Sequence, residues 1–412
     1  MNPEKAEQKE RVILVAVTDS DGMPPSVEEL KELVKTAGAE VAAVLVQHRS
    51  AMHPRTYLGT GKLLELEQMI SLTDATGIIC DDELTPSQIR SMEEVLHTKI
   101  MDRTLVILDI FAAHATSGEG KLQVELAQLR HRLTQLTGIG RDLSRLGGGI
   151  GTRGPGEKKL ETDRRLIGRR ISHLKRELKD LQQHRDLTRA QRMESEIPIA
   201  AIVGYTNAGK STLLNRLTGA EVLAADQLFA TLDPTTRLLE LPGKRQMLLT
   251  DTVGFIQKLP HHLVEAFRST LEEAGYADLI LHVVDASNPF WEQQVRTVYE
   301  TLQSLGISGK KILTVFNKCD LPPAEEHFFD FKADRVLHIS AKEGIGMEEL
   351  KEALTDLMRD EMQYLQKVFP YAESGKIALI RRYGELLKEE YKEDGTHVEA
   401  YVPARLLRKL EL

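Results

Sequence analysis

The stretch IPIAAIVGYTNAGKSTLLNRLTG, Ile197–Gly219, decides the fold of the central part of this 412-residue chain. It begins with a run of small and β-branched apolar residues, which is typical of a buried strand. The run enters the loop Gly204–Ser211, GYTNAGKS, and the residues after the loop have the apolar spacing of a helix. A strand, a G-x-x-x-x-G-K-[ST] loop and a helix in this order predict a P-loop that holds nucleotide phosphates.

The groups in this loop match what a nucleoside triphosphate and its metal ion require. Backbone N–H groups at the start of a helix favour the β-phosphate, and Lys210 can bridge the β- and γ-oxygens. The hydroxyl of Ser211 is a candidate ligand of Mg²⁺. The predicted nucleotide contacts in this segment are Gly204, Tyr205, Thr206, Asn207, Ala208, Gly209, Lys210, Ser211 and Thr212.

The sequence NKCD, Asn317–Asp320, predicts that the base is guanine. It ends an apolar strand about 107 residues after Lys210. The carboxylate of Asp320 can accept hydrogen bonds from guanine N1–H and N2–H₂. Adenine lacks this donor pair, and leaving a polar group unpaired is a strong discriminator. The sequence SAK, Ser340–Lys342, follows another strand and is predicted to offer a backbone N–H to guanine O6. The predicted base contacts are Asn317, Lys318, Cys319, Asp320, Ser340, Ala341 and Lys342.

The sequence DTVG, Asp251–Gly254, matches the DxxG motif that reads the γ-phosphate. We expect Asp251 to hold Mg²⁺ through water and the Gly254 N–H to sense the γ-phosphate. Thr252 and Val253 complete this nucleotide-binding segment. Many small GTPases then have a glutamine that orients the attacking water, whereas this chain has Phe255. We therefore expect slow intrinsic hydrolysis, with the missing group supplied by a partner, by rearrangement or by another side chain in cis.

The segment LFATLDPTTR, Leu228–Arg237, lies where a threonine that completes the Mg²⁺ shell is expected. Thr231, Thr235 and Thr236 all have the required hydroxyl. The chemistry of the residues alone does not choose between them.

The regions on both sides of the P-loop region contain further predicted elements. In the N-terminal domain, residues 1–115, a small parallel sheet is predicted, with strands Val12–Val17, Val41–Val46, Gly77–Cys80 and Thr104–Ile110, and helices near Ser26–Lys35, Gly61–Ile70 and Thr85–Leu96. The second α/β region, residues 197–364, has predicted strands at Ile197–Val203, Met247–Thr250, Leu279–Val284, Ile312–Phe316 and Val336–Ile339. The C-terminal residues 365–412 are predicted as strand Ile377–Ile380, helix Gly384–Lys392 and strand His397–Pro403.

Residues 116–196 are predicted to form a basic antiparallel helical hairpin with a glycine-rich tip. Leu122–Leu136 and Leu160–Leu181 have the heptad spacing of a helix–helix seam. The stretch RLGGGIGTRGPGE, Arg145–Glu157, joins them and contains six glycines. From Lys121 to Arg192 there are 18 Lys or Arg and 8 Asp or Glu, although the whole chain has a net charge of −8. A basic segment in an acidic protein indicates a local anionic partner, and a solvated helix pair is the alternative.

The glycine-rich tip lacks the lysine and hydroxyl of a P-loop and follows a helix, so we do not assign it to the nucleotide. Flexible backbone beside arginines suits contact with the phosphates of folded RNA. A connector that orders only on binding is the alternative. The candidate RNA-binding residues are Arg141, Arg145, Gly147, Gly148, Gly149, Gly151, Arg153, Gly154, Lys158 and Lys159.

The composition limits the class of protein. No run of eighteen apolar residues occurs, and the first ten residues are polar, so neither a membrane span nor a secretory signal is expected. Cys80 and Cys319, the two cysteines, are far apart in sequence, which argues against a disulfide framework or a cysteine zinc site. We expect a cytoplasmic protein.

With these motifs together, the sequence resembles the HflX family of bacterial GTPases over essentially its whole length. The G motifs alone indicate a translation-factor-class GTPase, whereas their pairing with the glycine-rich hairpin loop is specific to this family. The resemblance implies an α/β multidomain fold: a small parallel-sheet N-terminal domain, an antiparallel helical hairpin, a P-loop G domain of the TRAFAC type and a short α+β C-terminal tail. It implies that Thr231 is the Mg²⁺-binding threonine and that Lys210, Thr231 and Gly254 are catalytic. The further nucleotide contacts that it implies are Phe229, Ala230, Leu232 and Asp233.

The resemblance also implies partners and an activity. These are GTP or GDP with Mg²⁺, ribosome-stimulated hydrolysis, binding to the 50S subunit, and dissociation of stalled or idle 70S ribosomes, notably under heat stress. We expect a monomer, with a membrane-peripheral fraction as an addition to the cytoplasmic one. Two alternatives stay open: a GTP-regulated RNA-binding or remodelling module, and a protein-signalling switch that is not specific to the ribosome.

Overall fold

The computed structural model describes the chain except residues 1–8, 20–21, 147–154, 195–196, 220–227, 230–233, 259, 261–262, 264–270, 323–327, 361 and 410–412. The side chains of residues 137–146, 155–160, 184–194, 244, 404–405 and 409 are also outside the described part. The chain divides into two compact units. One contains residues 1–181, 226–233 and 256–268, and the other contains residues 182–225, 234–255 and 269–412.

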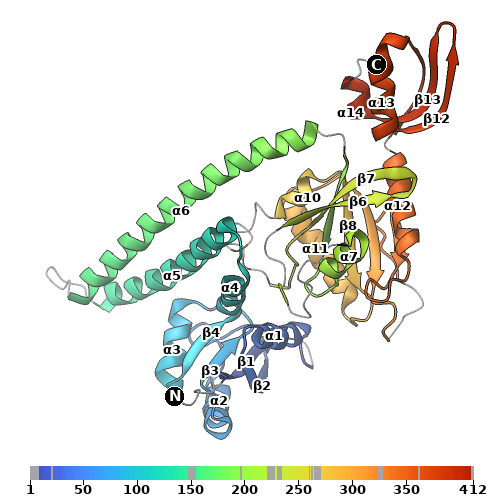
Figure 1. Cartoon of the computed structure of the whole chain (residues 1–412). Coiled ribbons are helices and arrows are strands. Elements are labelled where there is room, and N and C mark those ends of the chain that lie inside the picture. Colours follow the sequence, from blue (N-terminus) through green and yellow to red (C-terminus); the bar gives the residue numbers. More distant parts are fainter. Residues whose placement is uncertain are drawn as a thin grey trace, which may run out of the picture. The chain divides into compact units, whose positions relative to one another are not determined.

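The first unit begins with a parallel sheet in the order β2-β1-β3-β4, which confirms the predicted small N-terminal α/β domain (Figure 1). Its strands are β1, Arg11–Thr18; β2, Glu40–His48; β3, Gly77–Cys80; and β4, Lys99–Asp102. The helices between them are α1, Pro25–Thr36; α2, Thr60–Thr73; and α3, Pro86–Leu96. Thr85 and Gln88 form a reciprocal capping box that fixes the start of α3.

One predicted strand of this domain is wrong. Thr104–Ile110 lies in a helix, α4, Arg103–His114, and the fourth strand is the preceding β4. Asp102 ends the strand and caps the helix, because its carboxylate accepts a hydrogen bond from the Leu105 N–H at 2.9 Å. A short apolar run fits a buried helix as well as a buried strand, so periodicity alone could not separate the two.

Two long helices, α5, Gly118–Leu146, and α6, Pro155–Glu194, form the predicted helical hairpin (Figure 1). Their seam consists of the predicted heptad positions: Leu126, Ile171 and Leu174 are buried, and Leu122, Leu129, Leu133, Ile167 and Leu178 pack around them. Outside the seam, the Arg170 guanidinium donates two hydrogen bonds to the Glu125 carboxylate, at 2.7 and 2.9 Å. Apolar burial therefore pairs the two helices, and their polar residues remain at the surface.

The second unit contains a six-stranded sheet in the order β10-β9-β8-β5-β7-β6. The strands are β5, Ile199–Gly204; β6, Thr235–Leu241; β7, Arg245–Asp251; β8, Leu279–Asp285; β9, Lys311–Asn317; and β10, Arg335–His338. All pairs are parallel except β6 with β7. The sequence predicted five of these strands and missed β6, an edge strand whose first residues are only partly buried. The helices are α7, Lys210–Thr218; α10, Glu273–Tyr276; α11, Trp291–Ser304; and α12, Met347–Arg359.

The C-terminal residues of the same unit form a small antiparallel sheet in the order β11-β13-β12. The strands are β11, Met362–Phe369; β12, Glu385–Lys392; and β13, Gly395–Pro403. The helices are α13, Ser374–Tyr383, and α14, Ala404–Lys409. The predicted α+β character is confirmed, as is the strand at His397–Pro403.

Two predicted elements of this tail are exchanged in the structure. Ile377–Ile380, predicted as a strand, lies in α13, and Gly384–Lys392, predicted as a helix, is mainly β12. Ile377 and Ile380 are three residues apart, so a helix places both on one face, where they pack into the core with Val398. The pairing of β12 with β13 overrides the helix propensity of its Leu, Lys and Glu residues.

No helix among the described residues combines the length and the apolar character needed to cross a membrane.

We predict that Leu174→Ala will destabilise the hairpin by about 2–5 kcal/mol, because this side chain is fully buried in the α5–α6 seam and its loss leaves a cavity. Thermal melting followed by circular dichroism measures the change. Leu166→Ala is the matched control on the same helix, since Leu166 is 55% exposed. Equal melting temperatures for the two variants would contradict the proposed seam.

Candidate nucleotide site

Two glycines shape the loop between β5 and α7. Gly204 ends β5 with φ 156°, and a Cβ at this position would lie 2.2 Å from the Val283 carbonyl oxygen of β8. Gly209 precedes α7 with φ 93°, and a Cβ there would lie 2.2 Å from Asn317 Nδ2. Both positions combine a backbone conformation that favours glycine with an approach too close for any side chain. The two glycines of the G-x-x-x-x-G-K-[ST] pattern are therefore required because no side chain fits at either position.

The P-loop lysine is buried within this loop. Lys210 Nζ donates a hydrogen bond to the Tyr205 carbonyl oxygen at 2.7 Å. Burial lowers the pKa of the Lys210 ammonium to about 8, and the nearby Asp251 carboxylate opposes this shift only in part. A phosphate oxygen would supply the negative charge that this ammonium lacks.

A hydroxyl and a carboxylate meet beside the first turn of α7. Ser211 Oγ donates a hydrogen bond to Asp251 Oδ2 at 2.7 Å, and Asp251 is buried at the end of β7. Both are hard oxygen donors, which suit Mg²⁺. Within the described residues there is no group of three or more His, Cys, Asp or Glu that could hold a metal. The chemistry fits an ion that takes most of its ligands from phosphate and water, as Mg²⁺ does at nucleotide sites.

The DxxG segment packs tightly against the P-loop. A Cβ on Gly254 would lie 2.7 Å from Thr206 Cγ2 and 2.9 Å from Lys210 Nζ. The Phe255 N–H donates to the Gly204 carbonyl, and the Thr206 N–H donates to the Phe255 carbonyl. The Phe255 side chain is only 2% exposed. An apolar ring held in the core cannot orient a water molecule, which agrees with the expectation drawn from its residue type.

The carboxamide of Asn317 connects the two motifs that follow β9 and β10 to the P-loop. Its Nδ2 donates to the Ala208 carbonyl at 2.8 Å, and its Oδ1 accepts from the Ala341 N–H at 2.9 Å. The next residue, Lys318, has φ 64° and donates to Asp285 Oδ2 at 2.7 Å. NKCD and SAK are thus brought together beside the loop Gly204–Ser211.

The Asp320 carboxylate lies exposed at this edge, where it can meet a base. A hydrogen bond from Ser340 holds the pKa of Asp320 below its usual value, so this carboxyl is ionised at neutral pH. Cys319 is half-buried and its N–H donates to the Ile339 carbonyl.

The three candidate Mg²⁺-binding threonines are Thr231, Thr235 and Thr236, and only the last two are among the described residues. Thr235 and Thr236 lie in β6, and the Thr236 hydroxyl pairs with that of Thr250 at 3.0 Å. Thr231, which the family resemblance selects, lies outside the described residues together with Ala230, Leu232 and Asp233. Phe229 is described and buried.

The predicted RNA-binding residues cannot be placed in the same way. Gly147, Gly148, Gly149, Gly151, Arg153 and Gly154 lie outside the described residues, as do the side chains of Arg141, Arg145, Lys158 and Lys159.

Sequence reasoning missed Asp285 as a member of the site. It ends β8 and pairs in register with Asn317 of β9, and it holds the Lys318 side chain. An acidic residue at the end of an apolar strand, in the run LILHVVD, was the signal that could have indicated it.

Three families match successive parts of the chain. The family described as GTP-binding GTPase N-terminal matches residues 25–112, GTP-binding GTPase Middle Region matches residues 114–192, and 50S ribosome-binding GTPase matches residues 199–318.

Two bacterial relatives agree with these matches. A GTPase HflX of Lacrimispora saccharolytica is 60% identical over 99% of this chain and 97% of its own length. A GTPase HflX of Escherichia coli K12 is 41% identical over 90% of this chain and 87% of its own. Among solved structures, a GTP-binding protein of Sulfolobus solfataricus in complex with GDP is 26% identical, covers 84% of this chain and 98% of its own, and has a TM-score of 0.44.

We predict that Asp320→Asn will weaken GTP binding by about 10- to 100-fold, because the carboxamide is uncharged and can accept only one of the two guanine hydrogen bonds. The same variant should bind xanthosine nucleotides better than the wild type does, since the amide can donate to the oxygen that replaces the guanine amino group. Titration with fluorescent nucleotides measures both affinities. Unchanged GTP affinity would show that Asp320 does not read the base.

We predict that the affinity of the free protein for GTP falls about threefold between roughly pH 7.5 and 8.5. The pKa of Lys210 is lowered to about 8, so the ammonium that attracts the phosphates loses its proton as pH rises through this range. Calorimetric titration at several pH values measures the slope. Lys210→Met, which binds more weakly at every pH, should lack this slope, and an identical slope in this variant would assign it to another group.

Proposed function

Because this chain belongs to the HflX family of GTPases and hydrolyses GTP, we propose that it acts on the ribosome, where it binds the 50S subunit and promotes the dissociation of stalled or idle 70S ribosomes. The observation that carries this proposal is the joining of two parts in one chain. Residues 199–318 match a family described as a 50S ribosome-binding GTPase, and a basic hairpin precedes them.

The surface of the hairpin supports an RNA partner. The seam buries the apolar residues of α6, and most of the described cations of this helix are exposed. These exposed cations are Arg165, Arg169, Arg170, Lys175, Arg176 and Lys179. Phosphate contacts of this kind depend on charge and shape and need no sequence readout, which suits folded ribosomal RNA. We assign the glycine-rich tip, residues 145–157, to the same contact.

The roles of the site residues follow from the groups that they present. The P-loop N–H groups and Lys210 hold the β- and γ-phosphates, and the Asp320 carboxylate holds guanine. Ser211, Asp251 and Thr231 are the residues that would hold Mg²⁺, which neutralises phosphate charge when bound. The Gly254 N–H reports the presence of the γ-phosphate, because no side chain separates this backbone from the P-loop.

The burial of Phe255 explains why GTP hydrolysis would depend on a partner. A buried apolar ring cannot position water, so the group that orients the nucleophile comes from elsewhere. We propose that ribosome binding supplies it, directly or by rearranging this segment. Intrinsic hydrolysis is then slow, and GTP is retained until the protein has docked.

Dissociation of the 70S particle requires no mechanical work from hydrolysis. The GTP form binds the separated 50S subunit more tightly than it binds the 70S particle, and this difference alone shifts the equilibrium. Hydrolysis then allows the protein to leave. We propose that the chain does this as a monomer in the cytoplasm.

We predict that the protein with a non-hydrolysable GTP analogue will convert 70S particles to 50S and 30S subunits, whereas the protein with GDP will not. Sucrose-gradient sedimentation measures the subunit fractions. A variant with Gly147–Gly156 replaced by a short serine linker is the test of the tip: its intrinsic GTP hydrolysis should stay near the wild-type rate and its splitting should be lost.

The outcomes separate the alternatives. Equal subunit fractions with the analogue and with GDP would sink the splitting proposal. Nucleotide-independent RNA binding without preference for ribosomes would favour an RNA-remodelling module. Partner binding that survives exchange of the hairpin arginines for glutamine would favour a protein-signalling switch.

A further inference from the structure

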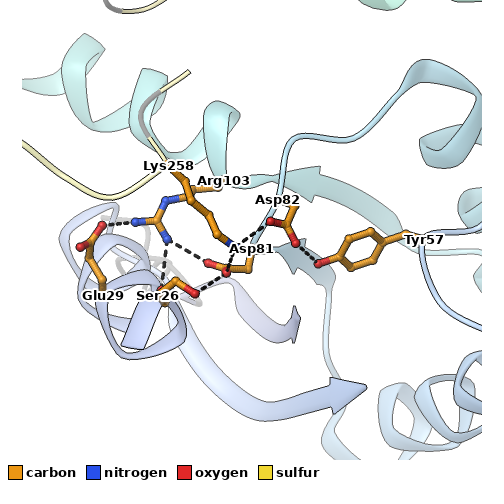
Figure 2. A network of polar contacts seen from close by, with 7 residues as sticks. All are labelled: Ser26, Glu29, Tyr57, Asp81, Asp82, Arg103 and Lys258. Atoms are coloured by element: carbon orange, nitrogen blue, oxygen red, sulfur yellow. Dashed lines mark hydrogen bonds and ion pairs between the residues drawn. The ribbon is translucent and has the colours of Figure 1, made fainter. Parts of the chain in front are cut away.

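Two consecutive aspartates, Asp81 and Asp82, follow β3 at the carboxyl edge of the N-terminal sheet. β1 pairs with β2 on one side and with β3 on the other, so the strand order reverses beside these aspartates. In open parallel sheets this is the position at which ligands bind. Here it receives a side chain from a distant part of the same chain. Lys258 Nζ lies 2.6 Å from a carboxylate oxygen of each aspartate (Figure 2).

Both aspartates are held firmly by other groups of the N-terminal domain. Asp81 is 1% exposed and accepts hydrogen bonds from Ser26 Oγ at 2.6 Å and from Arg103 Nη1 at 2.9 Å. Asp82 accepts a hydrogen bond from the Tyr57 hydroxyl at 2.7 Å. Figure 2 shows Ser26 of α1 and Arg103 of α4 reaching Asp81, and Tyr57 of the loop before α2 reaching Asp82. The carboxylates are therefore pre-positioned to receive a cation.

Without Lys258, the acidic groups of this cluster would outnumber its cations. Arg103 is buried and pairs with Asp81 and also with Glu29, so one cation serves two carboxylates before Asp82 is considered. Lys258 is the second cation of the cluster drawn in Figure 2. Burial alone would lower the pKa of the Lys258 ammonium, but the two aspartates raise it above its usual value. The ion pairs therefore persist at neutral pH.

Lys258 lies four residues after Gly254, in the segment that continues from DxxG. Its φ of 51° places it in the left-handed region, a conformation that costs free energy for a residue with a side chain. Lys258 belongs to the compact unit that also contains the N-terminal domain. The side chain of this residue is held by the ion pairs with Asp81 and Asp82.

A second anchor holds the other segment expected to respond to the γ-phosphate. Phe229, two residues before Thr231, also has a left-handed φ, 58°. Its ring packs edge-to-face on Phe111 with a centroid distance of 4.6 Å, and its carbonyl accepts a hydrogen bond from His114 Nδ1 at 2.8 Å. Phe111 and His114 lie on α4, the helix that begins with Arg103. One helix thus contributes to both anchors.

We propose that Lys258 is a positioning residue of the GTPase, whose ion pairs with Asp81 and Asp82 tie the chain that follows Gly254 to the N-terminal domain and transmit the nucleotide state to that domain. GTPases of this class reorder the DxxG segment and the Mg²⁺-threonine segment when the γ-phosphate arrives or leaves. In this chain each of these segments is anchored within a few residues of its motif. Exchange of GTP for GDP therefore changes the contacts that these segments make with α4 and with the end of β3.

The test compares hydrogen exchange of the full chain with GDP and with a non-hydrolysable GTP analogue. In the wild type, exchange at residues 80–84 and 103–114 should differ by about fivefold or more between the two nucleotides. In Lys258→Gln and Asp82→Asn, the ratio of the exchange rates with the two nucleotides should fall to about one. Lys258→Arg should retain the difference, because the guanidinium can pair with the same carboxylates. Lys62→Gln is the matched control, since Lys62 makes a similar ion pair with Glu65 at 2.8 Å on the same domain.

Coupling is reciprocal, so the ratio of the dissociation constants for GDP and for the analogue should change in the same variants by the same factor. Circular dichroism and thermal melting identify a variant that is merely misfolded. If Lys258→Gln is misfolded, Asp82→Asn replaces it as the test, because asparagine has the same shape as aspartate and can still accept the hydrogen bond from Tyr57. The proposal is overturned if the wild type shows no nucleotide-dependent exchange in these residues. It is overturned equally if Lys258→Gln retains the difference or if Lys62→Gln loses it as well. None of these readouts involves ribosomes, so they stand apart from the splitting proposal.

Discussion

The nucleotide site depends on one buried carboxamide, that of Asn317. It donates to a carbonyl of the P-loop and accepts from a backbone N–H of the SAK segment, so that a single side chain fixes segments following β5, β9 and β10. The Nδ2 and Oδ1 atoms of Asn317 make these hydrogen bonds at 2.8 and 2.9 Å, and the residue is 2% exposed. Breaking such a buried pair leaves a polar group unsatisfied, which costs about 1–3 kcal/mol for each group. The segments that we assign to the phosphates and to the base are therefore held by the same side chain.

Around this support, the site is assembled from close backbone contacts. Gly204, Gly209 and Gly254 each allow an approach that a methyl group would prevent. The polar groups of Lys210 and Ser211 are paired within the protein: Lys210 donates to a carbonyl of the same loop, and Ser211 donates to Asp251 at the end of β7.

Much of the site could be predicted from sequence because its chemistry lies in contiguous motifs with fixed spacing. GYTNAGKS, DTVG and NKCD each follow an apolar strand, and parallel strands bring their carboxyl ends to one edge. The hairpin seam was also readable, since heptad spacing records helix pairing directly. Local patterns failed where tertiary pairing decides. Thr104–Ile110 fits strand and helix equally, and Gly384–Lys392 has helical composition but pairs with β13.

Contacts between distant parts of the chain were invisible for a different reason. Lys258 and Asp82 are separated by 176 positions, and neither belongs to a motif. A lysine after DxxG and an aspartate pair after a strand are common on protein surfaces, so nothing local marks them as partners. The same holds for His114 and Phe229, which are 115 positions apart. Only the assembled fold shows that these residues meet.

The separation of Lys258 from Asp81 and Asp82 has a consequence for the order of folding during synthesis. Every strand of the N-terminal sheet is translated before residue 258, and the 176 intervening positions take about 10 to 35 s at ordinary elongation rates. During that interval the sheet forms around a pair of aspartates whose second cation does not yet exist. The nascent domain therefore carries an acidic edge that is neutralised only after the P-loop and DxxG have emerged. Completion of this edge marks the moment at which the P-loop and DxxG have been made, whereas NKCD and SAK are still to follow.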